Sequence, residues 1–181
     1  MISTQQIQES RILLIDDTVT NIQMLVEMLE QLGYPNVKGL TDARLATETF
    51  SEYKPDLVVL DIMMPYLDGF EVMRQFKALD PESAVPILVL TASSDQVTRL
   101  RALESGGSDF LVKPFDIMEV SLRIRNLLQV RALNKSLVEH IHFLEKVVRE
   151  RSVDLLTARE LLVKEKAQYY GNAESAELQA R

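Results

Sequence analysis

The chain has 181 residues, 46% of them hydrophobic, which suits one domain of ordinary size with an appendage and excludes a disordered protein. The net charge of −7 argues against direct binding of nucleic acid, which requires clustered lysine and arginine, and the absence of cysteine excludes disulfides, thiolate metal sites and thiol nucleophiles. No apolar run approaches the roughly 20 residues that span a bilayer, and the N-terminus lacks the pattern of a signal peptide, so we expect a cytoplasmic protein that does not enter the membrane.

Short apolar runs alternate with amphipathic stretches between residue 11 and about residue 130. This alternation is typical of repeated β-α units on a parallel sheet. Strands are predicted near residues 11–16, 37–41, 57–61, 86–91 and 109–112. The sequence therefore predicts an α/β fold with a doubly wound, five-stranded parallel sheet.

Helices are predicted between these strands from apolar residues at helical spacing. The first ends at Gly33, and Asp42 caps the second. The third follows Gly69, the fourth holds residues 97–103, and the fifth starts near Asp116.

The fifth helix is predicted to continue far beyond the sheet, because no proline occurs from Asp116 to about Tyr169. A helix of about 50 residues is about 75 Å long, which exceeds what one small domain covers. A heptad register places a mostly apolar seam at Leu127, Val130, Asn134, Leu137, Ile141, Leu144, Val148, Leu155 and Leu162. We expect a parallel coiled-coil homodimer, and the alternative is a solitary amphipathic helix that folds back on the domain.

The predicted organisation has four parts. Residues 1–10 form a flexible tail, and residues 11–130 form the α/β domain. Residues 131–169 form the coiled-coil helix, continuous with the fifth helix of the domain, and residues 170–181 form a small, polar, disordered tail.

Polar side chains stand at the ends of four predicted strands. Asp16 and Asp17 follow the first, Asp61 ends the third, Thr91 ends the fourth, and Lys113 follows the fifth. The carboxyl ends of parallel strands meet at one edge of a sheet, where open α/β folds build their sites. Carboxylates, a hydroxyl and an ammonium group gathered there predict a site that holds a divalent metal beside a phosphoryl group.

These motifs closely resemble the receiver domain of bacterial two-component response regulators. The resemblance covers roughly residues 11–130 and rests on Asp16-Asp17, the segment 61–69, the Thr91-Ala92 step and the segment 106–115. It implies a flavodoxin-like receiver fold with a signalling role. It also implies no enzyme beyond self-phosphorylation and autodephosphorylation.

The resemblance implies a role for each residue of the site. Asp61 would accept a phosphoryl group from a sensor histidine kinase or a phosphotransfer protein. Asp16, Asp17, Asp61 and the backbone carbonyl of Met63 would bind Mg²⁺ or Mn²⁺. Lys113 would hold a phosphoryl oxygen as a point charge.

Switching is also implied by the resemblance. Thr91 would donate its hydroxyl to the phosphoryl group, and the ring of Phe110 would turn into the space that opens. The peptide bond before Pro114 would be cis. The signal would then leave through the face formed by the fourth helix, the fifth strand and the fifth helix, and through the coiled-coil dimer.

Each site residue also has an ordinary structural interpretation. Asp16 and Asp17 could cap the next helix, Lys113 could be a solvated surface lysine, Thr91 a β-former at a strand end, and Phe110 plain core. Two alternative functions remain at this point. A Mg²⁺-dependent phosphatase of the haloacid-dehalogenase type would need a second carboxylate where Met63 stands, and a degenerate receiver would act only as a coiled-coil adaptor.

The run from Leu144 to Arg151 resembles the linker of regulators that continue into HD-GYP-type cyclic-di-nucleotide phosphodiesterases or other signalling enzymes. A downstream output domain or an effector partner is therefore a further expectation.

Overall fold

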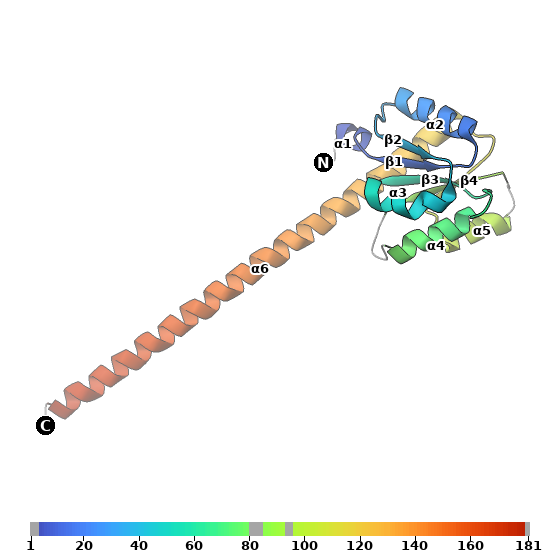
Figure 1. The fold of residues 1–181 in the computed structure, drawn as a ribbon. Coiled ribbons are helices and arrows are strands. Elements are labelled where there is room, and N and C mark those ends of the chain that lie inside the picture. The colour runs from blue at the N-terminus through green and yellow to red at the C-terminus, as the bar shows by residue number, and fades with distance from the viewer. Residues whose placement is uncertain (1–3, 80–84, 93–95, 180–181) are drawn as a thin grey trace. The chain divides into compact units, whose positions relative to one another are not determined.

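The fold was obtained as a computed structural model, which describes residues 4–79, 85–92 and 96–179. The chain divides into two units, residues 1–135 and residues 136–181. The first unit is an α/β domain with helices on both faces of one sheet, as Figure 1 shows. The second unit consists of the later residues of a single helix.

The sheet of the first unit has five parallel strands in the order β2-β1-β3-β4-β5. The three central strands are buried along their whole length, because helices cover both faces. The predicted doubly wound α/β fold is confirmed. The strands are β1 Ile12–Ile15, β2 Val37–Leu40, β3 Leu57–Asp61, β4 Ile87–Thr91 and β5 Asp109–Val112.

The helices form two layers, and alternate residues of each strand face one layer or the other. Leu14 and Val59 pack with α1, α2 and α6, whereas Leu13 and Val58 pack with α3, α4 and α5. The helices are α1 Thr4–Gln8, α2 Val19–Gln31, the short 3₁₀ helix η1 Ala43–Leu45, α3 Ala46–Tyr53, α4 Gly69–Leu79, α5 Gln96–Glu104 and α6 Ile117–Gln179.

The N-terminal segment differs from its prediction as a flexible tail. Residues 4–8 form α1, because Ile7 buries its side chain in the apolar cluster on the α2 and α6 side of the sheet. The domain therefore begins before residue 11.

The C-terminal segment also differs from its prediction. α6 continues to Gln179, so the expected disordered tail 170–181 is helical as far as the structure describes it. Residues 173–179 contain mostly alanine, glutamate, leucine and glutamine, which are strong helix formers. No helix in the described part of the chain combines the length with the apolar content that a membrane span needs.

Gly39 lies inside β2, where glycine usually weakens a strand, but here it meets a packing requirement. A Cβ atom at this position would lie 2.3 Å from Cγ2 of Ile22, a buried side chain of α2. The absence of a side chain on Gly39 therefore lets α2 approach the sheet closely.

We predict that Gly39→Ala lowers the free energy of unfolding by about 1–3 kcal/mol, the usual cost of overpacking a core. The same substitution should cost less in an Ile22→Leu background, because leucine has no Cγ2 methyl group on its Cβ atom. Urea unfolding of the four proteins of this cycle measures both effects. An equal cost in the two backgrounds would show that the close approach of Ile22 does not explain Gly39.

Candidate functional site

The carboxyl edge of the sheet holds three of the buried polar side chains that the described residues contain. Asp16, Asp61 and Thr91 are 1%, 6% and 2% exposed, and each stands at or directly after the end of a central strand. The fourth, Thr49, lies in α3. Burying a polar or charged group is costly unless it is paired or hydrogen-bonded, so buried side chains of this kind indicate a functional site at this edge.

Three carboxylates converge at this edge. Asp16, Asp17 and Asp61 each place one carboxylate oxygen within 4.8 Å of the others. Such a set of oxygen donors fits a hard divalent cation such as Mg²⁺. Met63 lies two residues beyond Asp61, with its side chain 73% exposed, in the loop that would supply a carbonyl oxygen.

Lys113 joins two of these carboxylates. Its Nζ lies 3.0 Å from Oδ2 of Asp16 and 3.2 Å from Oδ1 of Asp61. Its backbone N–H donates to the carbonyl of Thr91 over 2.8 Å, and the Lys113-Pro114 bond is cis. Lys113 is therefore not a solvated surface lysine but part of the acidic site.

Asp16 has a second task at the start of α2. Its Oδ1 accepts a hydrogen bond of 2.9 Å from the backbone N–H of Thr18, the residue that precedes α2. Asn21 donates through Nδ2 to both carboxylate oxygens of Asp16, each over 2.9 Å. Asp16 thus supports the helix start and faces the site. Sequence reasoning missed Asn21, whose only signal is its place one turn into the helix after the acidic pair.

The electrostatics of the site are dominated by burial. Burial raises the pKa of the Asp61 carboxyl, the charge of Lys113 opposes this change, and the nearby charge of Asp16 adds to it. Burial alone would lower the pKa of Lys113, but its hydrogen bond to Asp16 and the charge of Asp61 outweigh that effect, so its pKa is raised. One ammonium group faces three carboxylates, and a further cation would relieve the excess negative charge.

Gly69 fixes the backbone beside Asp61. A Cβ atom here would lie 2.5 Å from the carbonyl oxygen of Asp61, so only glycine lets α4 begin against the end of β3. The N–H of Gly69 donates to the carbonyl of Ile62 over 3.0 Å. The predicted start of the third helix after Gly69 therefore also shapes the loop of the site.

Phe110 lies on the edge strand β5. Its ring packs partly buried against the apolar cluster on the α3, α4 and α5 side, and Cζ of Arg123 lies 5.8 Å from the ring centroid. Arg123 binds both carboxylate oxygens of Asp109 through Nη1, each over 2.7 Å, and Glu119 through Nη2. Sequence reasoning missed this link between β5 and α6.

A family model for the response regulator receiver domain matches residues 12–125. The chain belongs to the response regulator receiver family. Neither alternative function is favoured: Met63 stands where a phosphatase of the haloacid-dehalogenase type would need a carboxylate, and the acidic site of the receiver is intact.

Curated relatives of this receiver are about twice as long as the region that they share with it. The chain is 42% identical over 122 residues to "Probable transcriptional regulator ycf27" of Porphyridium aerugineum, covering 67% of this chain and 49% of that protein. It is 37% identical over 119 residues to the alkaline phosphatase synthesis transcriptional regulatory protein PhoP of Bacillus subtilis (strain 168), covering 66% of this chain and 48% of that protein. The chain thus spans about half the length of these curated relatives.

Solved receiver structures share the fold. The Francisella response regulator 1452 receiver domain superposes with a TM-score of 0.62 at 28% identity, covering 66% of this chain and 97% of that one. The receiver domain of sensor histidine kinase PA1611 from Pseudomonas aeruginosa PAO1 gives a TM-score of 0.61 at 31% identity, covering 66% and 98%. That structure is described with a magnesium ion coordinated in its active site cleft.

The raised pKa of Asp61 predicts how stability depends on pH. In the folded receiver this carboxyl holds its proton to a higher pH than its ordinary value of 3.8, so stability falls as the pH rises from 3.8 through the raised pKa. Asp61→Asn removes this loss and should stabilise the metal-free protein at neutral pH by roughly 0.5–2 kcal/mol.

Chemical unfolding of both proteins in EDTA at several pH values measures this difference. The advantage of the asparagine variant should grow across the window above pH 3.8 and then level off. An advantage that is independent of pH, or a loss of stability at neutral pH, would show that burial does not disfavour the charged form of Asp61.

Proposed function

We propose that this receiver accepts a phosphoryl group on Asp61 from a phosphohistidine of a sensor histidine kinase or phosphotransfer protein. The supporting observation is the buried carboxylate of Asp61 at a strand end, with Lys113 3.2 Å away and the carboxylates of Asp16 and Asp17 beside it. No other described group of acidic residues gathers in this way.

The step is an in-line transfer. A carboxylate oxygen of Asp61 forms the new bond to phosphorus as the bond from phosphorus to the histidine nitrogen breaks, and the electron pair of that bond returns to the imidazole. Asp16, Asp17, Asp61 and the carbonyl of Met63 would hold a divalent metal, which would supply positive charge between the two anions as they approach. Lys113 then moves its charge from the carboxylates to a phosphoryl oxygen.

The switch follows from where Lys113 and Thr91 are anchored. The hydroxyl of Thr91 donates to a second phosphoryl oxygen, which draws the end of β4 inward. Phe110, one strand away, turns toward the vacated space, and Arg123 carries this change from β5 to α6. The result is a shift between two states of one fold.

The face that responds is formed by α5, β5 and α6. On it, apolar side chains are exposed without a described partner that buries them: Val97, Leu100, Leu103, Ile117, Met118 and Leu122. Among the described apolar residues of α5, which is the fourth helix predicted from the sequence, only Ala102 is buried. An exposed apolar surface of this kind suits binding to another protein surface.

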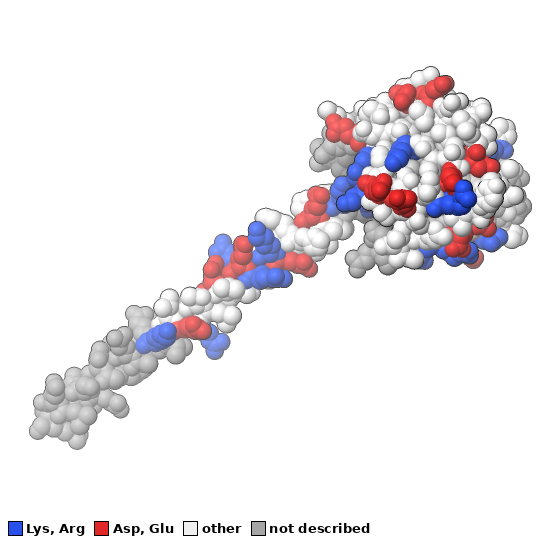
Figure 2. All heavy atoms as spheres, in the orientation of Figure 1, with Lys and Arg blue, Asp and Glu red and all other residues white. Residues whose placement is uncertain are grey.

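The second unit is proposed to dimerise as a parallel coiled coil. Of the expected seam, Leu127 instead packs partly buried against the core of the first unit, and Asn134 is exposed. The remaining apolar members are 46–70% exposed: Val130, Leu137, Ile141, Leu144, Val148, Leu155 and Leu162. Charged side chains gather in groups along the described part of this unit, with uncharged stretches between them, as Figure 2 shows.

Acetyl phosphate and Mg²⁺ test the phosphoryl acceptor. We expect one acid-stable, base-labile phosphoryl group per chain in intact-mass spectra, lost in Asp61→Asn and in EDTA but retained in Asp154→Asn, the matched control. Lys113→Gln should slow the reaction by about 100-fold, because it removes the charge that holds the phosphoryl oxygen. Modification that persists in Asp61→Asn, or repeated turnover of phosphate esters, would contradict the proposal.

Sedimentation equilibrium tests the coiled coil. Leu144→Glu and Val148→Glu place charges in the seam and should shift the protein from dimer to monomer. Leu156→Glu makes the same change one position away from the seam and should leave the dimer intact. A monomeric wild-type chain, or equal effects of all three substitutions, would refute the dimer.

A further inference from the structure

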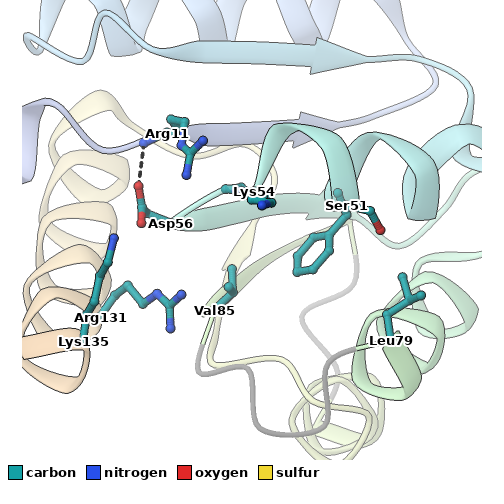
Figure 3. Close-up of a pocket in the computed structure, with 10 residues that line it drawn as sticks. Arg11, Ser51, Lys54, Asp56, Leu79, Val85, Arg131 and Lys135 are labelled. Carbon is teal, nitrogen blue, oxygen red and sulfur yellow. Dashed lines mark hydrogen bonds between the residues drawn. The ribbon is translucent and has the colours of Figure 1, made fainter. Parts of the chain in front are cut away.

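A second charged site lies at the amino edge of the sheet, opposite to Asp61. A pocket of about 430 Å³ opens there, and Figure 3 shows its lining. Arg11 precedes β1, Lys54 and Asp56 precede β3, and Arg131 and Lys135 come from α6. All these residues belong to the first unit.

The pocket is strongly cationic. Among the described residues its lining holds Arg11, Lys54, Arg131 and Lys135 and one carboxylate, that of Asp56, in a chain of net charge −7. Oδ2 of Asp56 already accepts a hydrogen bond of 3.0 Å from the backbone N–H of Arg11. None of the four cationic side chains forms a salt bridge with the described residues. Like charges held together in this way favour a bound anion.

Arg131 brings a hydrogen-bond donor that no described residue satisfies. Its Nε is buried and has no hydrogen-bond partner, the one such side-chain atom among the described residues. A buried donor without an acceptor costs about 1–3 kcal/mol, so native structures rarely leave one. In Figure 3 the side chains of Arg131 and Arg11 extend from different elements toward the same space.

The other wall of the pocket is apolar. It consists of Phe50, Pro55, Leu79 and Val85, and the ring of Phe50 is held by stacking on Phe76 at a centroid distance of 4.3 Å. The volume lies in the range of about 300–1,000 Å³ that is typical of small-molecule sites. A phosphate ion alone would fill only part of it and would leave the apolar wall uncovered.

We propose that this pocket binds a small organic phosphate of about mononucleotide size. Arg131, Arg11 and Lys135 hold the phosphate, and the apolar part of the ligand covers Leu79 and Val85. Because its cations come from the residue before β1, the turn before β3 and α6, the bound ligand fastens residues 131–135 of α6 to the edge of the sheet. This site takes no part in the chemistry at Asp61.

Isothermal titration of the full chain with AMP tests the proposal. The titration is carried out with Asp61→Asn protein in EDTA, so that neither the metal nor the acceptor carboxylate contributes. We expect saturable binding of one AMP per chain, with affinity that falls as salt rises because the contacts are ionic. Inorganic phosphate and adenosine should each bind at least tenfold more weakly than AMP.

Charge-neutralising variants locate the site. Arg131→Gln and Lys135→Gln should each weaken AMP binding at least tenfold, whereas Arg125→Gln, an exposed arginine of α6 outside the pocket, should not. Circular dichroism checks that each variant folds. If Arg131→Gln does not fold, Lys135→Gln alone serves as the test. Amide NMR shifts on AMP addition should cluster at residues 51–56 and 131–135.

Three outcomes would overturn the proposal. AMP and GMP could show no saturable binding at millimolar concentration, or binding could persist unchanged in the two pocket variants. Inorganic phosphate could also bind as tightly as AMP, which would leave an adventitious ion only. Phosphorylation of Asp61 is measured separately with acetyl phosphate, so none of these outcomes bears on the receiver chemistry.

Discussion

The meeting of three carboxylates and one ammonium group at a buried sheet edge is the constraint on which this receiver depends. Asp16 and Asp61 are held there by the ends of β1 and β3, and Lys113 by the end of β5. Burial raises the pKa of Asp61, the charge of Asp16 adds to this change, and the charge of Lys113 opposes it. A divalent cation held between these carboxylates would offset their excess negative charge. The fold tolerates this excess of charge because its two apolar clusters lie on either side of the same strands.

The same edge of the sheet is connected to α6 through β5. Lys113 follows β5 directly, and Phe110 and Asp109 lie on that strand. Arg123 of α6 binds Asp109 and lies near the ring of Phe110. The carboxyl end of β5 therefore reaches the acidic site, and the side chains of β5 contact α6. A change in the partner of Lys113 at the site thus has a short path to the helix. The path consists of one strand and one ion pair rather than a long chain of contacts.

Much of this arrangement could be predicted from the sequence, because parallel strands bring their carboxyl ends to one edge. Asp61 and Lys113 stand directly at such ends, and their meeting required no knowledge of side-chain packing. Asn21 and Arg123 were not predicted because each is an ordinary polar residue inside a helix. Which neighbours such a residue contacts depends on how the helix is turned about its axis, which the sequence does not give. α1 escaped prediction because Ile7 is the one buried side chain among its described residues. The cationic pocket escaped because its charges come from separate segments, where each one reads as a solvated lysine or arginine.

The first turns of α6 belong to the core of the domain as much as the strands do. Val120, Ile124 and Leu128 are buried in the same apolar cluster as Leu14 and Leu88. α6 therefore cannot detach from the domain unless the domain unfolds. Any exchange of modules between such proteins, by recombination or by design, has its natural junction beyond Lys135, where the first unit ends.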